Sequence, residues 1–332
     1  MKIAIVKLSA LGDIIHAMVV IQFIKNHDPN IEIDWIVAEK YKELLDFHPS
    51  LNKVHTINIK NDKKKTSVYL IINEVKKLRK LDSYDLVIDM QGLIKSAIIS
   101  HFIPSTVTLG FDKLSAREGL ASIFYNKTFK FSYDKNVIER NFELIKYSLG
   151  LRSNIKDIKH KLPFLHSNKE KLTSGMSNIK KNIILIPGAS FLSKRYPLEK
   201  FAELPNLLDA NYLVIWGNKE EKLLADNIKK LEPSVTVCEK LSIKALISLV
   251  AKSNLLIGPD TGPTHMGWAL NVPSITLFGP TPGYRNTFIT EKNKIIESKS
   301  EVNPYKIDKS DHSIDDISVE KIAEVAKSLL DL

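Results

Sequence analysis

Residues 2–17, KIAIVKLSALGDIIHA, join an apolar run to an amphipathic stretch through a short turn. The run at residues 3–8 predicts a buried strand, and the apolar periodicity after the turn predicts a helix. The carboxylate of Asp13 lies where the turn meets that helix and has two interpretations. It could cap the helix, since Asp is a preferred N-cap residue, or it could act as a base toward a substrate. The residues alone leave both interpretations open.

The alternation of apolar runs and amphipathic stretches continues along the first half of the chain. Further strands are expected at residues 33–37, 54–59 and 86–90, each followed by a plausible helix. Such alternation is typical of parallel strands joined by helical crossovers. Residues 153–171 lose the pattern and are rich in Lys, His and Ser, so they predict a linker.

A second series of elements follows the linker. Strands are expected at residues 182–186, 212–216, 235–238, 255–257 and 274–278, and helices at residues 198–208, 220–231, 243–251, from Pro263 onward and at 318–330. In two α/β halves of this kind, ligands bind at the carboxyl ends of the strands. The sequence therefore predicts an α/β protein with domains at residues 1–160 and 172–312 and a closing helix within residues 313–332.

The composition is that of a globular protein with an excess of positive charge. The 332 residues are 44% hydrophobic and 26% charged, and the formal net charge is +10. That charge favours anionic partners such as nucleic acid, a membrane surface or phosphorylated substrates. Cys238 is the only cysteine, which excludes an intrachain disulfide and a Cys-based zinc site. Neither a secretory signal nor a membrane span is expected, and the predicted location is the cytoplasm.

Several reaction classes lack their sequence signatures. No two glycines stand two residues apart, so the G-x-G-x-x-G dinucleotide motif is missing, and so is the G-x-x-x-x-G-K-[ST] phosphate loop. No Asp-x-Asp pair and no H-E-x-x-H motif occurs. These absences argue against a dehydrogenase, an NTPase, a metalloprotease and a sugar-nucleotide site built on metal-bridging carboxylates. No metal site and no cofactor are expected.

Two strand ends in the second half predict an anion-binding site. In LLIGPDTGPTHMGWAL, residues 255–270, a strand leads into a turn and then into a helix that begins near Pro263. Backbone amides and the helix dipole at such a start favour a diphosphate, although the same turn could be an ordinary capped connection. In IPGASFLSKRYP, residues 186–197, Lys194 could bring a cation to the same site or could belong to a solvated basic loop.

Other polar groups also follow predicted strands. In VIWGNKEEK, residues 214–222, a glutamate could accept hydrogen bonds from ribose hydroxyls or could stabilise the dipole of the next helix. Gln91 and Arg117 follow strand ends of the first half and could line a cleft opposite the phosphate site. Lys63 and Lys64 form either a basic rim of that cleft or a solvated face.

These motifs together resemble the lipopolysaccharide heptosyltransferases of glycosyltransferase family 9. The likeness runs through KLSALGDIIHA, DMQGLIKSA, GFDKLSAREGLASIFYNKTF, VIERNFELIKYSLGL, SKRYP, VIWGNKEE and GPDTGPTHMGWAL, and it covers most of the chain. The combination is specific, whereas each motif alone is weak. Two positions depart from the family pattern, because Asn136 stands where relatives often have His and Tyr196 stands where Trp is common.

The resemblance implies a GT-B fold, with two Rossmann-like domains facing a central cleft and the C-terminal helix packed back on the first domain. It implies an inverting, metal-independent enzyme that transfers L-glycero-D-manno-heptose from ADP-heptose to the inner Kdo of Kdo2-lipid A. The reaction would take place at the cytoplasmic face of the inner membrane, with the enzyme peripheral to it. The first domain would bind the acceptor and the second the nucleotide sugar.

The resemblance also matches the family's catalytic carboxylate to Asp13 and its phosphate-binding lysine to Lys194. Together with the strand-end positions, it defines the residues expected at the site. The expected donor-binding residues are Gly12, Ser190, Lys194, Trp216, Gly217, Glu221, Asp260, Thr261, Gly262 and His265, and the expected acceptor-binding residues are Lys63, Lys64, Gln91 and Arg117.

Two alternatives stay open for the function. A heptosyltransferase that adds a later heptose would share most of these motifs, although SARE and VIERN favour the first addition. A non-catalytic protein that binds nucleotide sugars or nucleic acid would also use the positive charge. Basic patches interleaved with aromatic residues for base stacking are not evident, so no nucleic acid partner is expected.

Overall fold

The computed structural model describes residues 1–59, 67–167 and 175–331, and the chain separates into two compact units. The first unit comprises Met1–Phe164 and the second Leu165–Leu332. The boundary lies within the linker expected at residues 153–171, which also contains the 3-10 helix η3 (Ile155–His160). Lys63 and Lys64 lie outside the described residues, so their role stays a prediction.

The first unit is built on a six-stranded parallel sheet with the strand order β3-β2-β1-β4-β5-β6. The central strand β1 is the apolar run of the opening motif, and its residues from Ile3 to Val6 are fully buried. The strands are β1 (Lys2–Val6), β2 (Glu32–Ala38), β3 (Lys53–Ile57), β4 (Tyr84–Asp89), β5 (Ser105–Phe111) and β6 (Lys127–Phe129).

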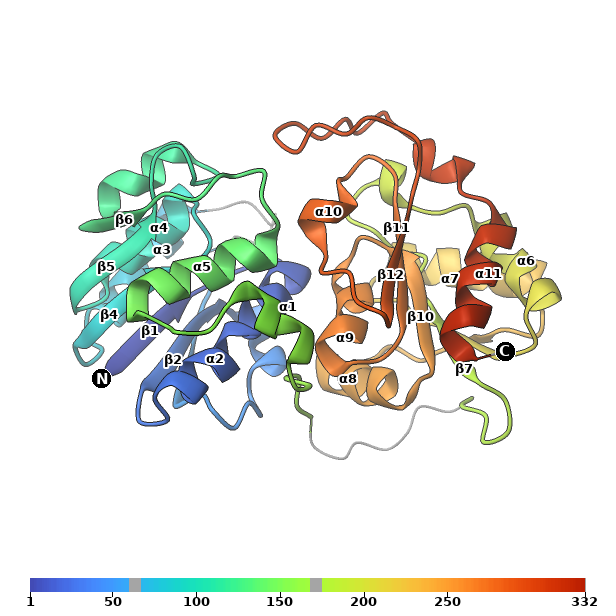
Figure 1. Cartoon of the computed structure of the whole chain (residues 1–332), viewed down its shortest axis with the longest axis horizontal. Helices are drawn as coiled ribbons and strands as arrows, with labels where there is room; N and C mark the ends of the chain where they lie inside the picture. Colours follow the sequence, from blue (N-terminus) through green and yellow to red (C-terminus); the bar gives the residue numbers. More distant parts are fainter. Residues whose placement is uncertain (60–66, 168–174, 332) are drawn as a thin grey trace. The chain divides into compact units, whose positions relative to one another are not determined.

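Helices cover both faces of this sheet (Figure 1). The helices α1 (Leu11–Met18), α2 (Val20–His27) and α5 (Val137–Leu149) form one group, in which α5 contacts the other two. On the other face, α3 (Val68–Leu78) contacts α4 (Ile94–Phe102), and α4 contacts the 3-10 helix η2 (Gly119–Phe124). Right-handed crossovers require this arrangement, because the chain moves outward from β1 in one direction and from β4 in the other. A further 3-10 helix, η1 (Glu39–Leu44), follows β2.

The second unit repeats the architecture with a six-stranded parallel sheet in the order β12-β11-β10-β7-β8-β9. Its strands are β7 (Asn182–Leu185), β8 (Asn211–Val214), β9 (Thr236–Val237), β10 (Leu255–Pro259), β11 (Ser274–Phe278) and β12 (Asn293–Glu297). Its helices are η4 (Leu192–Lys194), α6 (Leu198–Leu207), α7 (Lys219–Leu231), α8 (Ile243–Lys252), α9 (Gly262–Leu270), α10 (Gly283–Asn286), η5 (Ser313–Asp316) and α11 (Val319–Leu330).

The closing helix α11 forms within the expected residues 313–332. It contacts α6, β10 and β11, and its apolar face, including Ile322, Ala326 and Leu330, is part of the core of the second unit. That unit needs a helix over β10 and β11 to bury the sheet. The apolar face of α11 is therefore used within the second unit, and its packing on the first domain stays a prediction.

Each sheet has a point at which the strand order reverses, and these points position the candidate site. In the first unit the reversal lies between β1 and β4, and in the second it lies between β7 and β10. The connections that leave the carboxyl ends of such a strand pair diverge to opposite faces of the sheet and leave room for a ligand. Asp13 follows β1 and Gln91 follows β4, while Lys194 follows β7 and Asp260 follows β10.

Candidate active site

Asp13 is the third residue of α1, and Ala10 is the N-cap. The Oδ2 atom of Asp13 accepts a hydrogen bond from the Ala10 backbone amide at 3.0 Å. Asp13 thus closes the first turn of the helix by reaching back to the cap, as an acidic residue does at this position of a capping box. The side chain is half-buried, and its Oδ1 atom has no hydrogen-bond partner within the described parts of the chain. One oxygen serves the fold and the other is available for chemistry.

Gln91 holds the turn that precedes Asp13. Its Oε1 atom accepts hydrogen bonds from the backbone amides of Leu8, at 3.0 Å, and Ser9, at 3.1 Å. This contact is possible because β4 is the neighbour of β1, so the two strands end side by side. Gln91, which the sequence predicts to bind the acceptor substrate, therefore uses its side-chain oxygen to hold the backbone. Its side-chain nitrogen remains available to a ligand.

Asp89 fixes the start of the loop that carries Gln91. It is fully buried and accepts hydrogen bonds from the backbone amides of Gln91 and Gly92 and from the hydroxyls of Ser96 and Tyr125, at 2.7–3.2 Å. Burial raises the pKa of this carboxyl, although the four donors oppose that rise. Because both carboxylate oxygens of Asp89 accept hydrogen bonds from the protein itself, Asp89 has a structural role.

Arg117 lies in the loop between β5 and η2, where its side chain is exposed and has no partner among the described residues. The loop is fixed to the end of β4, since the Glu118 amide donates to the Gly92 carbonyl at 3.1 Å. The Glu118 carboxylate accepts a hydrogen bond from the Ile94 amide, at 2.7 Å, at the start of α4. The fold therefore brings the backbone of Arg117 beside the loop that carries Gln91.

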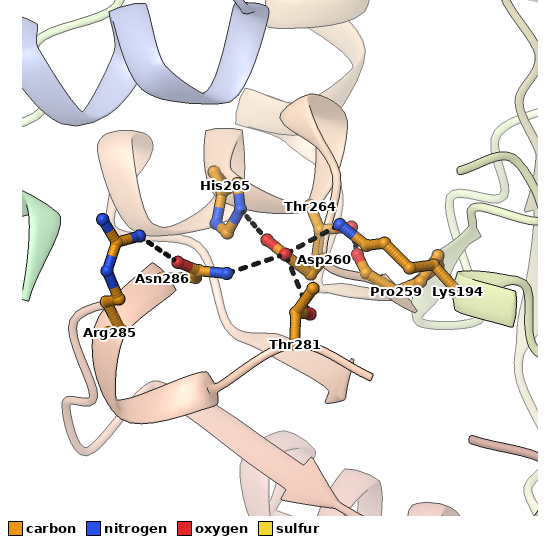
Figure 2. Close-up of polar contacts among 8 residues, drawn as sticks. All are labelled: Lys194, Pro259, Asp260, Thr264, His265, Thr281, Arg285 and Asn286. Carbon is orange, nitrogen blue, oxygen red and sulfur yellow. Dashed lines mark hydrogen bonds and ion pairs between the residues drawn. The ribbon is translucent and has the colours of Figure 1, made fainter. Parts of the chain in front are cut away.

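In the second unit, Lys194 and Asp260 form a buried ion pair (Figure 2). The Lys194 Nζ atom lies 2.7 Å from the Asp260 Oδ2 atom, and the side chains are 9% and 11% exposed. Lys194 ends the short helix η4 after β7, and Asp260 directly follows β10. The alternative that Lys194 belongs to a solvated basic loop is therefore wrong.

Three further side chains converge on Asp260, as Figure 2 shows. His265 contacts the Oδ1 atom at 3.0 Å, while Thr281 and Asn286 donate to the Oδ2 atom at 3.1 and 3.2 Å. Burial alone would raise the pKa of Asp260, but Lys194 and His265 outweigh it and hold that pKa far below its usual range. Asp260 is thus a permanent anion and a very weak base.

The turn after Asp260 gives the amide-rich helix start that the sequence predicts. Thr261 is the N-cap of α9, Gly262 is the first helical residue, and a proline follows. The Thr264 hydroxyl donates to the Pro259 carbonyl at 2.8 Å, which fixes the first turn against the strand end. The amides at the start of a helix have no partner within it, so this turn can bind an anion beside the Lys194 cation.

Glu221 has contacts that support the helix-stabilising interpretation of its motif, and its role toward the ribose stays a prediction. Its Oε2 atom accepts from the Gly217 amide and its Oε1 atom from the Asn218 side chain, each at 2.7 Å. The Asn218 side chain in turn accepts from the Glu221 amide at 3.0 Å, so the two residues cap α7 reciprocally. Glu221 stabilises the helix start, and a ribose contact would have to share its oxygens.

The remaining expected donor residues follow strands of both units: Ser190 follows β7, Trp216 follows β8, and Gly12 follows β1 of the first unit. Trp216 donates from its indole nitrogen to the Cys238 carbonyl at 2.7 Å, and Ser190 is exposed in the loop after β7. Glu221 lies against Gly188, where an added Cβ would stand 2.6 Å from the Glu221 carboxyl carbon. The loop after β7 is therefore in direct contact with the first turn of α7. Gly12 is the second residue of α1, directly before Asp13.

Sequence reasoning missed Thr281, Arg285 and Asn286. Thr281 and Asn286 contact Asp260 directly, and the Arg285 guanidinium donates to the side-chain Oδ1 atom of Asn286 at 3.1 Å. All three follow β11, which pairs with β10. The polar segment GPTPGYRN, residues 279–286, directly follows a predicted strand. This position was the available signal that its side chains could lie near Asp260, because the carboxyl ends of neighbouring parallel strands lie together.

The two departures from the family pattern have local structural roles. Asn136 is the N-cap of α5, and its side chain accepts hydrogen bonds from the amides of Ile138 and Glu139. The buried Tyr196 donates its hydroxyl hydrogen to the Ile317 carbonyl at 2.9 Å. Both residues thus satisfy backbone groups within their own units.

Two features, a metal-binding cluster and a membrane-spanning helix, are absent from the described residues. Outside residues 60–66, 168–174 and 332, no group of three or more His, Cys, Asp and Glu side chains is arranged to hold a metal ion. Over the same residues, no helix has the length and apolar character needed to cross a bilayer.

Comparison with known structures agrees with this fold. The chain resembles the structure of the heptosyltransferase WaaC from E. coli with ADP-2-deoxy-2-fluoro heptose, with a TM-score of 0.77, 24% identity and coverage of 98% of this chain and 99% of that one. Two parallel α/β units with this likeness define the GT-B class of glycosyltransferases, as the sequence predicts.

The family follows from sequence similarity. The model of glycosyltransferase family 9 (heptosyltransferase) matches residues 72–313. The lipopolysaccharide heptosyltransferase 1 of Campylobacter coli is 40% identical over 348 residues, which cover 99% of each chain. The enzyme of the same name from Pseudomonas aeruginosa is 29% identical over 87% of this chain and 81% of its own. The chain belongs to glycosyltransferase family 9, the heptosyltransferases.

Proposed function

We propose that this heptosyltransferase transfers L-glycero-D-manno-heptose from ADP-heptose to the inner Kdo of Kdo2-lipid A, in the synthesis of the lipopolysaccharide core. The support is the similarity to lipopolysaccharide heptosyltransferase 1 along the whole chain. The positions of Asp13 and Lys194 at the two strand-order reversals also support it. The enzyme acts at the cytoplasmic face of the inner membrane, where it is a peripheral protein.

The second unit binds the nucleotide diphosphate. A diphosphate at the start of α9 accepts hydrogen bonds from the Thr261–Thr264 turn and lies within reach of the Lys194 cation, which Asp260 orients. As the sugar leaves ADP, negative charge grows on the β-phosphate. A fixed cation and fixed amide dipoles stabilise that charge without reorganisation. The buried Asp260 network keeps Lys194 in place for this task.

Asp13 is the base of the reaction. The acceptor hydroxyl attacks the anomeric carbon of heptose, its proton passes to the Oδ1 atom of Asp13, and the bond between that carbon and the β-phosphate oxygen breaks. The new glycosidic bond forms on the face opposite the departing ADP, which inverts the configuration. Asp260 is unsuited to this role because Lys194 and His265 hold its pKa far below the usual range.

The first unit binds the acceptor. Kdo2-lipid A carries phosphates and carboxylates, and the exposed Arg117 offers a guanidinium beside the loop of Gln91. A guanidinium binds such groups through two parallel hydrogen bonds. Lys63 and Lys64 are proposed to add charge to the same surface.

The observation that carries this proposal is the half-buried Asp13 carboxylate, with one oxygen in the helix cap and the other unpartnered among the described residues. The test is incubation of the purified protein with ADP-heptose and Kdo2-lipid A, followed by mass analysis of the lipid. The expected product carries one additional heptose. Transfer to an acceptor that already carries a heptose, but not to Kdo2-lipid A, would instead assign a later step. No transfer to either acceptor would favour a non-catalytic binding protein.

A further inference from the structure

The face of the first unit opposite α1, α2 and α5 exposes large apolar side chains. On α3, Val68, Tyr69 and Ile72 are 73%, 70% and 48% exposed. On η2, Leu120 and Ile123 are 61% and 73% exposed. Single exposed apolar residues are ordinary, whereas several on neighbouring elements indicate a surface that contacts a partner.

Specific contacts join α3, α4 and η2 into one continuous surface. The guanidinium of Arg79, at the end of α3, lies 5.8 Å from the ring centre of Phe102 on α4. The His101 ring of α4 contacts the Phe124 carbonyl of η2 at 3.1 Å. The loop before η2 lies against its first residue, since a Cβ at Gly119 would stand 2.6 Å from the Lys113 carbonyl oxygen. We call the outer side of these elements, including residues 113–117, the α3–η2 face.

Helix α3 divides its surface by polarity. Its inner side buries Val75 and Leu78 against the sheet. Its outer side presents Tyr69, Ile72, Lys76 and Arg79, at spacings of three and four residues that place them in one stripe. The stripe is apolar over the first two turns and basic at the end. Such an amphipathic pattern, with aromatic and aliphatic residues next to cations, is typical of helices at a lipid–water interface.

The α3–η2 face carries an excess of positive charge. Its basic residues are Lys76, Lys77, Arg79, Lys80, Lys95, Lys113 and Arg117. Its acidic residues are already used within the protein. Glu74 is buried and pairs with Lys77 at 2.9 Å, Asp112 accepts from the Ser115 amide, and Glu118 accepts from the Ile94 amide. Seven basic side chains against these three carboxylates, one of which pairs with Lys77, leave the face with a net positive charge.

The opposite layer of the same unit has a different surface. Helix α5 mixes acidic and basic residues, with Glu139, Glu143 and Lys146 on its outer side and Tyr147 as its exposed large apolar residue. Apolar residues combined with an unbalanced positive charge thus distinguish the α3–η2 face from the outer side of α5.

We propose that the α3–η2 face docks on a lipid bilayer that contains anionic lipids. The cations match the headgroup charge, and the apolar side chains of α3 and η2 enter the boundary between headgroups and acyl chains. Both α3 and η2 follow carboxyl ends of strands, α3 after β3 and η2 directly after the loop of Arg117 that leaves β5. The inference rests on the proposed function in one respect, since docking here brings a lipid-anchored acceptor to the acceptor-binding edge.

Vesicle binding tests the proposal directly. The full-length protein is sedimented with vesicles of phosphatidylcholine alone and of phosphatidylcholine with phosphatidylglycerol, all without acceptor lipid. Strong binding to the anionic vesicles and weak binding to the neutral ones is expected. Absence of binding to the anionic vesicles would overturn the proposal.

Two double variants at exposed positions separate the contributions of charge and of apolar side chains to vesicle binding. Lys76→Glu with Lys80→Glu should weaken partition onto anionic vesicles by at least about 25-fold, since one lysine near such a surface strengthens binding about five-fold. Leu120→Ser with Ile123→Ser should weaken it about ten-fold. Matched controls lie on or beside α7 of the second unit, where Lys230→Glu with Lys240→Glu and, separately, Leu223→Ser, 65% exposed before the change, should have little effect. Equal losses in the controls would contradict the proposal.

A labelled side chain gives a second readout. Cys238 is buried, and burial raises the pKa of its thiol to about 11, so an introduced cysteine can be labelled selectively. An environment-sensitive fluorophore on Ile123→Cys should shift to shorter wavelength with anionic vesicles, whereas the same label on Leu223→Cys should not. If the serine variants change the oligomeric state in solution instead, the face is a contact between two copies and the proposal is wrong.

Turnover of a deacylated, water-soluble form of the acceptor separates this proposal from the proposed function. The double variants should process that acceptor at the wild-type rate while losing activity on vesicle-embedded acceptor. Turnover without vesicle binding would overturn only the docking proposal. Vesicle binding without turnover of either acceptor would overturn only the proposed function.

Discussion

Replacement of Lys194 by Met should affect both the stability of the second unit and its affinity for ADP. The side chains of Lys194 and Asp260 are 9% and 11% exposed, so the variant leaves a buried carboxylate without its main counter-charge. Loss of one partner of a buried pair destabilises by about 3–5 kcal/mol. We expect about 3 kcal/mol, because His265, Thr281 and Asn286 still contact Asp260. The melting temperature of the second unit should fall by roughly 6–12 °C.

The same variant should bind ADP about 10- to 100-fold more weakly, because one charge-assisted contact with a phosphate contributes about 1.5–3 kcal/mol. Calorimetric titration with ADP measures this loss, and scanning calorimetry measures the melting temperature. Lys252→Met, at the exposed end of α8, is the control and should change neither quantity. The double variant Lys194→Met with Asp260→Asn removes both charges at nearly constant volume.

The double variant decides whether the pair has the energetics described. It should recover most of the lost stability, since a buried pair replaced as a whole costs far less than one that is broken. It should not recover ADP affinity, because the cation is still absent. A double variant no more stable than Lys194→Met would refute the pairing argument, and wild-type ADP affinity in either variant would refute the assignment of the diphosphate site.

Three further predictions concern the first unit and the chemistry. Arg117→Ala should raise the KM for the acceptor by about 10- to 100-fold and leave ADP affinity unchanged; steady-state kinetics would contradict this if donor and acceptor use fell equally. Burial opposes ionisation of Asp34, but hydrogen bonds from His55, Tyr84 and Asn52 outweigh it and lower its pKa to about 2. Because this folded-state pKa lies below the unfolded value of about 3.9, the contribution of about 2 kcal/mol is present above pH 4 and lost as the pH falls through 2. Acid unfolding of Asp34→Asn should lack that part of the pH dependence, and an unchanged acid transition would be contrary evidence. Heptose transfer should persist in EDTA, and chelator inactivation reversed by a divalent ion would show that a metal is required.

Much of the fold could be predicted because its central strands are continuous apolar runs. β1, β2, β7 and β11 are buried over nearly their whole length and were recognised from composition. β5, β6 and β12 were missed. β5 alternates small and apolar residues, β6 has only three residues, and β12 begins and ends with polar residues, so none of them has the pattern of a buried parallel strand.

The site could be predicted where its residues directly follow a recognised strand. Lys194 lies in the segment after β7, and Asp260 and the start of α9 lie in the segment after β10. The contacts of Gln91 with the amides of Leu8 and Ser9 could not be foreseen, because they depend on β4 being the neighbour of β1. Thr281 and Asn286 follow the predicted strand β11, and the pairing of β11 with β10 brings them to Asp260.

The role of Glu221 and the packing of α11 show two different limits of prediction from sequence. The reciprocal cap between Asn218 and Glu221 was visible as an Asn followed three residues later by Glu, which is a capping pattern. The functional interpretation of Glu221 competed with that signal. The amphipathic pattern of α11 predicted a helix correctly but could not reveal its partner, since an apolar stripe does not specify which surface it covers.

The rate of heptose transfer by Asp13→Asn, measured with saturating ADP-heptose and Kdo2-lipid A and compared with the wild-type rate, tests the assignment of the base most directly. Asn can still accept the hydrogen bond from the Ala10 amide, so the start of α1 and the affinity for ADP should be preserved. The rate should fall by about 10²- to 10⁴-fold, the usual contribution of a general base. An Asp13→Asn variant that keeps most of the wild-type rate would show that Asp13 only closes the helix cap.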